Sequence, residues 1–583
     1  MKKSGKWKVQ FLVMAFCVLG LVAVLVGSSY AIFSDVSDQG DYNTVTAGTL
    51  QLSYEDTQSL SLSNLYPVSD VEGMTGEGYT FTVRNIGTLP SDYKVMIQDD
   101  SAMIQADGCS DHLMPKANIK ISIDGGTPFL LSSIEGSNYM ITTGNLQPGE
   151  SVTHVVKVWI DEASGNEILG THFHGKVVVE GVQGEFVYQD ESGANPPKLV
   201  DGMIPVTYDG SKWVKADTSN KWYDYNNQEW ANAVTVTEEN RATYMSAPAG
   251  TEIPMEDINT MWVWIPRYEY MYTNLGTQYA GGSKTQPGAI NINFLSGTST
   301  TPSDSANYKV HPAFTFGDEE LSGLWYAKFE TGGTLVSACT NESCDTSNVV
   351  IKPNISSLRN QKLSSFFYTA RSMQLNENNP YGFTSISGNL HVSKNSEWGA
   401  VAYLSQSKYG KYGNPNYEGV NKEIYQNKSS ECITGSSNGM PGTDITNEQV
   451  TYDTPDTGYG ASTTGTIYGV YDMSGGAQDY VMGNYNNIIG YSGFSSMPDS
   501  KYYDLYTTTD STTACGGDIC YGHALSETAG WYTDGWSFLT DTNTWVYRSS
   551  FHTNTTSSGV FYYSNGVGAN AYSTSATRFT ITP

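Results

Sequence analysis

Short runs of alternating apolar and polar residues, separated by turn residues, recur through the first third of the chain. The runs occupy residues 45–52, 79–83, 119–123 and 155–160, and a run of valines at 177–179 follows. Successive side chains on a strand point to opposite faces, so each run predicts a strand with one buried face. Turns such as Asp124-Gly125-Gly126 separate them. Without any helical period, this pattern predicts an antiparallel β-sandwich over residues 32–185.

The first 31 residues read as an export signal. Four lysines precede an apolar run at 11–26, and small residues follow it. This order predicts cleavage between Ala31 and Ile32 by a signal peptidase. The alternative is an uncleaved anchor, because the apolar run is almost long enough to span a bilayer. We therefore expect a secreted or surface-located bacterial protein.

The charge balance limits the classes of partner. The 59 acidic residues outnumber the 31 basic ones, which gives a net charge of -28. Binding to nucleic acid needs clustered lysine and arginine, so we expect no nucleic-acid partner. The chain also has 41 tyrosines and 59 glycines. Such a composition is typical of extracellular β-rich or loop-rich modules.

Few cysteines are present, and four of them form two close pairs with four intervening residues, Cys339/Cys344 and Cys515/Cys520. In an exported chain this spacing predicts two small loop-closing disulfides. The alternative is a four-thiolate metal site, although the spacing is wider than zinc sites usually show. The pairing of Cys109 and Cys432 stays open.

The remaining chain forms a second, larger region. Residues 186–200 are polar and contain Asn195-Pro196-Pro197, which predicts a linker before a domain over 201–583. Tryptophan and tyrosine become dense after it. The run at 261–268 predicts a buried strand that Pro266 ends or places at a sheet edge. Residues 395–404 have the polar start and the composition of a helix.

Two stretches of the first region resemble the camelysin and TasA-type biofilm-matrix proteins. They are the junction at 31–35 followed by Thr-Ala-Gly-Thr-Leu at 46–50, and the segment 145–151 leading into 158–161. The resemblance implies a jelly-roll sandwich, a dedicated signal peptidase and self-assembly into fibres. In such fibres the segment from Ile32 onward adds a strand to a neighbour's sheet.

Some members of that family have been called metallopeptidases, which draws attention to His172 and His174. Alternate residues on a strand share a face, so the two imidazoles could bind one metal ion. The sequence has no H-E-x-x-H motif. We therefore expect two exposed strand histidines without a catalytic role.

Three motifs in the second region resemble the formylglycine-generating-enzyme, or sulfatase-modifying-factor, type of C-type-lectin fold. They are Ser-Glu-Trp at 396–398, the run at 467–476 that ends in Ser-Gly-Gly, and the segments 546–551 and 576–579. The resemblance implies a large α+β lectin-like domain. This chain departs from the family pattern at Gln478-Asp479, where Trp-Glu is usual. No cysteine follows Cys520, so the family's oxidase chemistry is not expected and we predict no enzyme.

The segment after Val546 is the predicted ligand-binding surface. Tyrosine provides rigid contact area, while asparagine and serine provide adaptable hydrogen bonds, as in antibody paratopes. The alternative is a set of solvated β loops. The candidate ligand-binding residues are Arg548, His552, Asn554, Tyr562, Tyr563, Asn565, Asn570 and Tyr572.

We expect no cofactor apart from structural calcium. Residues 217–229 and 444–456 are rich in carboxylates and amides, the oxygen ligands that calcium prefers. The alternative for both segments is ordinary turn chemistry. The predicted fold class is thus mainly β with some α, a sandwich followed by a lectin-like domain. The predicted function is binding of an extracellular glycan or protein, with a structural fibre subunit as the alternative and an extracellular enzyme as the weakest one.

Overall fold

The computed structural model describes residues 52–56, 60–62 and most of 66–583. The gaps in the last range are positions 88, 109, 111, 138 and 148 and residues 184–187, 273–281, 284–285, 418–421, 442–448, 512–519 and 569–572. The predicted cleavage site at Ala31 and Ile32 and most of the strand predicted at 45–52 lie outside them. Within the described ranges the fold is mainly β, with several antiparallel sheets, as predicted. None of the helices in these ranges is long and apolar enough to cross a membrane.

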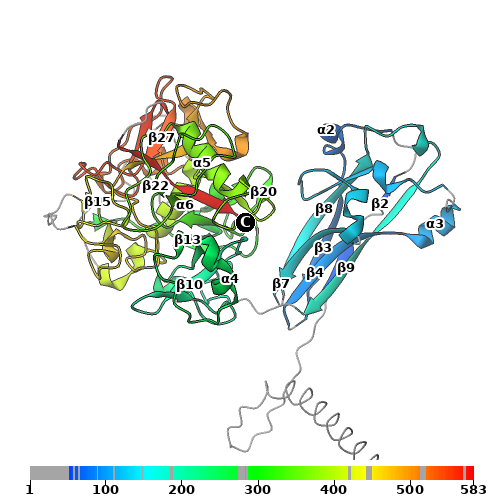
Figure 1. The fold of residues 1–583 in the computed structure, drawn as a ribbon, viewed down its shortest axis with the longest axis horizontal. Coiled ribbons are helices and arrows are strands. Elements are labelled where there is room, and N and C mark those ends of the chain that lie inside the picture. Colours follow the sequence, from blue (N-terminus) through cyan, green and yellow to red (C-terminus); the bar gives the residue numbers. More distant parts are fainter. Residues whose placement is uncertain are drawn as a thin grey trace, which may run out of the picture. The chain divides into compact units, whose positions relative to one another are not determined.

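The N-terminal region consists of two antiparallel sheets and two short helices (Figure 1). The first sheet has the order β1 (Leu52–Asp56), β3 (Tyr79–Asn85), β8 (Ser151–Ile160), β5 (Ile119–Ile123) and β6 (Phe129–Leu130). The second has the order β2 (Leu60–Leu62), β9 (Phe173–Gln183), β4 (Ser91–Asp99) and β7 (Met140–Leu146). The helices are α2 (Asp70–Gly73) and α3 (Ser101–Asp107). The strands predicted at 79–83, 119–123, 155–160 and 177–179 are confirmed.

Aliphatic side chains from both sheets form the core of this region. Val83 on β3, Ile121 on β5 and Val95 on β4 are fully buried and belong to one hydrophobic cluster. Alternation explains this burial, because every second residue of β3 faces inward. The predicted glycine turn is also present, since Asp124 and Gly125 have φ of 51° and 76°. Two consecutive positive φ values are typical of a type I′ turn.

The C-terminal region contains two larger sheets. The first has the order β11 (Trp213–Lys215), β10 (Ile204–Tyr208), β12 (Asn232–Val236), β13 (Ile258–Pro266), β21 (Gly323–Ala327), β30 (Phe579–Thr582) and β24 (Asn389–Val392). The second has the order β26 (Asp504–Tyr506), β25 (Gln478–Tyr485), β27 (Trp545–Arg548) and β28 (Tyr563–Gly566), and β29 (Ser575–Thr577) pairs with β25. The last strand of the chain thus lies inside the first sheet (Figure 1).

Smaller elements complete the C-terminal region. A three-stranded sheet has the order β17 (Ile292–Phe294), β14 (Tyr268–Met271) and β18 (Tyr308–Val310). Strand pairs are formed by β15 (Gly282–Ser283) with β16 (Gln286–Pro287), β19 (Thr315–Phe316) with β20 (Glu319–Glu320), and β22 (Gly332–Gly333) with β23 (Val349–Val350). The α-helices are α4 (Glu238–Ser246), α5 (Leu363–Leu375) and α6 (Asn395–Ser405).

Indole rings lie at the centre of the seven-stranded sheet. Trp264 on β13 and Trp325 on β21 are register partners, and their ring centroids are 5.3 Å apart. Both rings are fully buried. The prediction of a buried strand that ends at Pro266 is confirmed. A buried indole needs an acceptor for its N–H, and both acceptors come from the segment before residue 201.

That segment was expected to be a linker, and the structure shows it packed against the C-terminal core. The main-chain oxygen of Asn195 accepts from Trp264 Nε1 at 2.9 Å, and that of Lys198 accepts from Trp325 Nε1 at 2.6 Å. The amide of Asn195 donates to three carbonyl oxygens, those of Leu295, Gly297 and Ser322. Residues 188–200 are therefore part of the C-terminal packing, because they supply the acceptors that the indoles require.

Helix α6 is the predicted helix at 395–404, and its start is fixed by buried polar contacts. Glu397 accepts from the main-chain N of Lys394 at 2.7 Å and pairs with His391 at 3.0 Å. Its neighbour Trp398 is fully buried and donates to the carbonyl of Val560 at 3.0 Å. The Ser-Glu-Trp motif therefore has a structural role: it begins the helix and ties it to the segment that precedes β28.

Candidate functional site

The segments predicted to bind a ligand meet around one turn, residues 475–478. Gly475 and Gly476 both have positive φ, 82° and 76°. The N–H of Gly475 donates to Ser550 Oγ at 3.0 Å, and the main-chain N of His552 donates to the oxygen of Gly476 at 3.1 Å. From the other side, Gln478 contacts Tyr562. The turn at 475–478 thus contacts both halves of the predicted ligand segment.

Two of the candidate residues lie in the interior. Arg548 is fully buried, donates to Asn395 Oδ1 at 2.7 Å and lies 5.5 Å from the ring centroid of Tyr563. Burial lowers the pKa of Arg548 to about 10. Tyr563 is only 1% exposed. The expectation of surface positions is corrected for both, because every residue of β27 is buried and Tyr563 at the start of β28 pairs with Arg548.

His552 and Asn554 are half-buried and anchor the segment after β27. Gln426 donates to the carbonyl of Asn554 at 2.6 Å, and the side-chain amide of Asn554 donates to Ser557 at 3.3 Å. Burial, followed by the nearby Arg359, lowers the pKa of His552. His552 is therefore neutral at physiological pH.

Tyr562 and Asn565 are half-buried at the edge of the five-stranded sheet. The amide of Gln478 donates to Tyr562 Oη at 3.4 Å and to Ser564 Oγ at 3.5 Å. Asn565 donates to Ser537 Oγ at 3.2 Å and accepts from Asn543 at 3.0 Å. Because the contacts of Gln478 are long, a ligand can replace them at low cost. Asn565 instead positions the loop at 534–543.

That loop presents Trp536, which was not among the predicted residues. Trp536 is 41% exposed, and its main chain bridges to Tyr563. The preceding Gly535 lies under the ring of Tyr562, since a Cβ there would lie 2.9 Å from the ring. The sequence held a signal for it: Trp536 follows Asp-Gly in a stretch without aliphatic alternation, unlike the indoles of the buried strands.

A buried ionic group lies beneath the turn. Arg578 pairs with Asp479 at 3.3 Å, and both side chains are fully buried. Asp472 accepts from Asn427 and from the N–H of Gly435 at 3.0 and 2.9 Å, and Glu330 accepts from Ser357. Burial raises the pKa of Asp479 to about 7 despite the opposing effect of Arg578, and it also raises the pKa of Glu330 and Asp472.

Asn570 and Tyr572 belong to residues 569–572, outside the described residues, so the structure does not place them. Cys339 and Cys344 form the predicted disulfide. Cys520 is also disulfide-bonded, while its predicted partner Cys515 lies in 512–519, again outside the described part. Cys432 is a free, buried thiol. Cys109 is outside the described residues.

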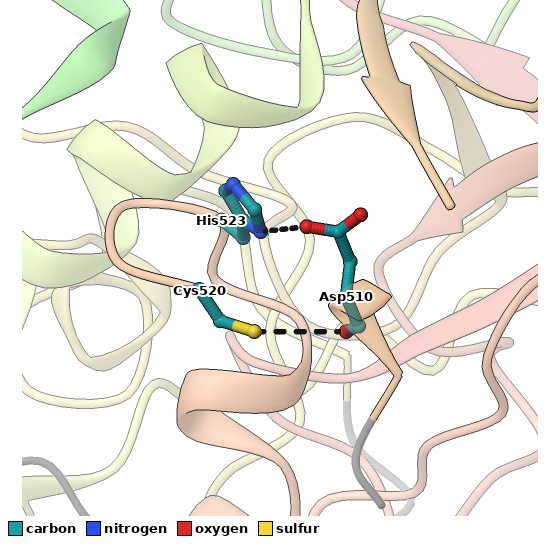
Figure 2. A group of neighbouring side chains, drawn as sticks. All are labelled: Asp510, Cys520 and His523. Carbon is teal, nitrogen blue, oxygen red and sulfur yellow. Dashed lines mark hydrogen bonds and ion pairs between the residues drawn. The ribbon is translucent and has the colours of Figure 1, made fainter. Parts of the chain in front are cut away.

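Asp510, Cys520 and His523 come close enough to suggest a metal centre. Their potential ligand atoms lie within 4.8 Å of one another. Figure 2 shows the imidazole of His523 directed at Asp510, 3.5 Å from its carboxylate, and the sulfur of Cys520 near the Asp510 main chain. The disulfide removes the thiolate that a metal would need. Two ligands remain, so these residues do not fit a metal centre in the oxidised protein.

The carboxylates of the predicted calcium segments cap their own turns. Asp217 accepts from Ser219 and Asn220, and Asp224 accepts from Lys221 and Asn227. Asp444 lies outside the described residues. Elsewhere in the described chain, apart from the group around Asp510, no three His, Cys, Asp or Glu side chains come close enough to hold one metal ion. The turn-chemistry alternative accounts for the contacts of residues 217–229.

His172 and His174 line a small pocket of about 120 Å³ together with Asp99, Lys116 and four apolar residues. Their ring centroids are 6.0 Å apart, so the two imidazoles share a face as predicted. His174 is 5% exposed, which corrects the expectation of two exposed histidines. Asp99 is paired with Lys116 at 3.0 Å. Within the described residues no third ligand joins the two histidines.

Comparisons with known proteins add little to this site. No family model matches the chain, and no curated protein matches it. Among solved structures the chain is similar to Treponema denticola variable protein 1, with 11% identity and a TM-score of 0.19. The match covers 50% of this chain and 92% of that one. At this TM-score the similarity does not establish a shared fold.

Proposed function

We propose that the protein is an exported bacterial surface or matrix protein whose C-terminal region binds an extracellular glycan or protein. The single observation that carries this proposal is the arrangement of Gln478, Tyr562 and Ser564. The amide of Gln478 lies between the Tyr562 hydroxyl and the Ser564 hydroxyl at the sheet edge and donates only a long hydrogen bond to each, at 3.4 and 3.5 Å. Binding sites commonly combine an aromatic surface with a few polar groups that fix orientation.

The finer architecture belongs to the same proposal. We propose a jelly-roll for the N-terminal region, supported by its two antiparallel sheets, and a lectin-like fold for the C-terminal region. The second assignment is supported by the contacts of the motif residues, with Glu397 at the start of α6 and Arg578 beneath the 475–478 turn. We propose a role in binding without catalysis, in which the buried Arg548 and Arg578 stabilise the fold.

The test is a binding measurement with the full chain. Purified protein is presented to a panel of bacterial and host glycans and surface proteins, and saturable binding is expected. Tyr562→Ala and Gln478→Ala should each weaken the binding at least tenfold. Tyr66→Ala is the matched control, since Tyr66 is an 85% exposed tyrosine of the N-terminal region. An absence of saturable binding, or equal losses for all three variants, would overturn the proposal.

A second candidate, a structural fibre subunit, is favoured by strand β7. Within the described residues β7 pairs only with β4, so its other edge is open. Its seven residues, Met140–Leu146, include no lysine and no proline, the residues that commonly protect an edge strand. Electron microscopy of the purified protein tests this role. Fibres that Thr143→Lys abolishes would support it, and dispersed particles at all concentrations would contradict it.

A further inference from the structure

Trp536 differs from every other tryptophan of the described residues. The indoles of Trp159, Trp213 and Trp222 are at most 5% exposed, and the remaining seven are also buried. Trp536 alone is 41% exposed. Exposed indole surface forgoes the stabilisation that burial gives. The fold buries ten indoles and leaves this one in contact with solvent. Trp536 is therefore a candidate for direct contact with a ligand.

The loop that holds Trp536 is fixed on both sides. Asp534 is buried and accepts from the N–H of Phe561 at 3.0 Å. The N–H of Gly535 donates to Ser557 at 2.9 Å, and that of Ser537 donates to Tyr563 at 3.1 Å. The indole therefore projects from a backbone that is already ordered. Binding of a ligand to the indole therefore does not incur the entropic cost of ordering the loop.

The exposed residues that follow Trp536 in the loop are neutral and polar, with the exception of Asp541. Ser537, Thr540 and Thr542 are exposed and Asn543 is half-buried, while Asp541 is the one charged side chain between 535 and 547. No lysine or arginine occurs in this stretch, and the chain as a whole carries -28. An anionic ligand would find no cation here and would be repelled by the long-range field. A cage for an organic cation needs several ring faces, and the loop exposes a single indole.

We propose that the loop at 534–543 is a stacking platform for a neutral saccharide. The negative face of the indole attracts the C–H face of a pyranose ring, and the hydroxyl and amide side chains of the same loop bind the sugar hydroxyls. The rigid indole offers this contact area at low entropic cost. This inference rests on the proposed binding function, because it names the ligand class for the same edge of the sheet.

The experiment uses the full chain and neutral oligosaccharides of glucose, mannose, xylose and N-acetylglucosamine. Isothermal titration calorimetry measures affinity, and tryptophan fluorescence reports the indole. We expect Trp536→Ala to weaken binding at least tenfold and Trp536→Phe to retain part of it. Ile386→Ala is the control, because Ile386 is 92% exposed and lies outside the loop. Circular dichroism checks that each variant is folded.

Three outcomes would overturn the saccharide assignment: equal affinity of wild type and Trp536→Ala, binding restricted to sialylated or sulfated sugars, and binding of choline in place of sugars. The proposed binding function would still hold after any of these outcomes if Tyr562→Ala weakens binding of a different ligand. Failure of the wild-type protein to bind anything in either panel would overturn both.

Discussion

The two regions of the molecule have cores of different chemistry. In the N-terminal region, aliphatic side chains such as Val83, Val95 and Ile121 alternate along regular strands and fill the space between two sheets. In the C-terminal region the interior holds indoles and ionised groups, among them Trp264 and Arg578. The first core depends mainly on hydrophobic burial, with a few buried polar contacts such as Tyr93 to His154, whereas the second buries many more polar and charged groups that need partners. Specific pairs, and not only apolar area, therefore hold the candidate binding surface in place.

The largest expected effect comes from breaking the buried pair of Arg578 and Asp479. Arg578→Met leaves Asp479 buried without its cation, which typically costs about 3–5 kcal/mol. Urea unfolding followed by tryptophan fluorescence measures the loss, because almost all described indoles lie in the C-terminal region. The control is Lys212→Met, which removes an exposed pair with Glu252 and should cost less than about 1 kcal/mol. Equal losses for the two variants would show that the buried pair has no special role.

The next effect is a pH dependence confined to the C-terminal region. Burial raises the pKa of Glu527 to about 7, although Tyr403, Tyr270 and Gly522 donate to its carboxylate. A carboxyl whose pKa is raised on folding stabilises the folded state at low pH, and this stabilisation is lost as pH rises through the folded pKa. Between pH 5 and pH 8 the free energy of unfolding should therefore fall, by up to roughly 3 kcal/mol.

Calorimetry at several pH values checks this expectation. Glu527→Gln should flatten the profile of the C-terminal transition, and Asp479→Asn should flatten it further, since burial also raises the pKa of Asp479 to about 7. The N-terminal transition should be the same in both variants and in wild type. A C-terminal profile that rises between pH 5 and pH 8 would contradict the assigned direction.

The smallest expected effect comes from a substitution in the N-terminal core. Val95→Ala removes two buried methyl groups from the sandwich core and should cost about 2 kcal/mol. The thermal transition of the N-terminal region should shift, while that of the C-terminal region should not. Val71→Ala is the control, because Val71 is 80% exposed. A shift of both transitions by Val95→Ala would mean that the two cores unfold as one unit.

The same difference explains how far the sequence predicts the structure. Strands β3, β5 and β8 are predicted by the alternation of apolar and polar residues, because this period of two is typical of a strand with one buried face. Helix α6 and the end of β13 at Pro266 are predicted by local residue types, namely a polar helix start and a proline. The burial of Arg548 could not be predicted from local sequence, because its hydrogen-bond partner Asn395 is 153 residues away in the chain. Likewise, the acceptors for Trp264 and Trp325 come from a segment whose prolines suggest a linker.

For the candidate site, sequence reasoning proposed a segment and could not separate its buried residues from its half-buried ones. Tyr562 and Tyr563 are adjacent and equally suited to binding by composition. Tyr563 begins β28 and is buried, whereas Tyr562 precedes the strand and is half-buried, a difference that only the tertiary structure shows. Trp536 was missed because its Asp-Gly context indicates only an exposed loop, while the main-chain contacts that hold this loop beside β28 carry no sequence signal.

The most direct test of the account is hydrogen–deuterium exchange of the full chain with and without a saturating ligand from the binding panel. The account predicts slower exchange at residues 534–543 and 562–566 and at the 475–478 turn, with no change in β4, β7 or β9. Slower exchange confined to the N-terminal sheets, or to the pocket lined by His172 and His174, would contradict it.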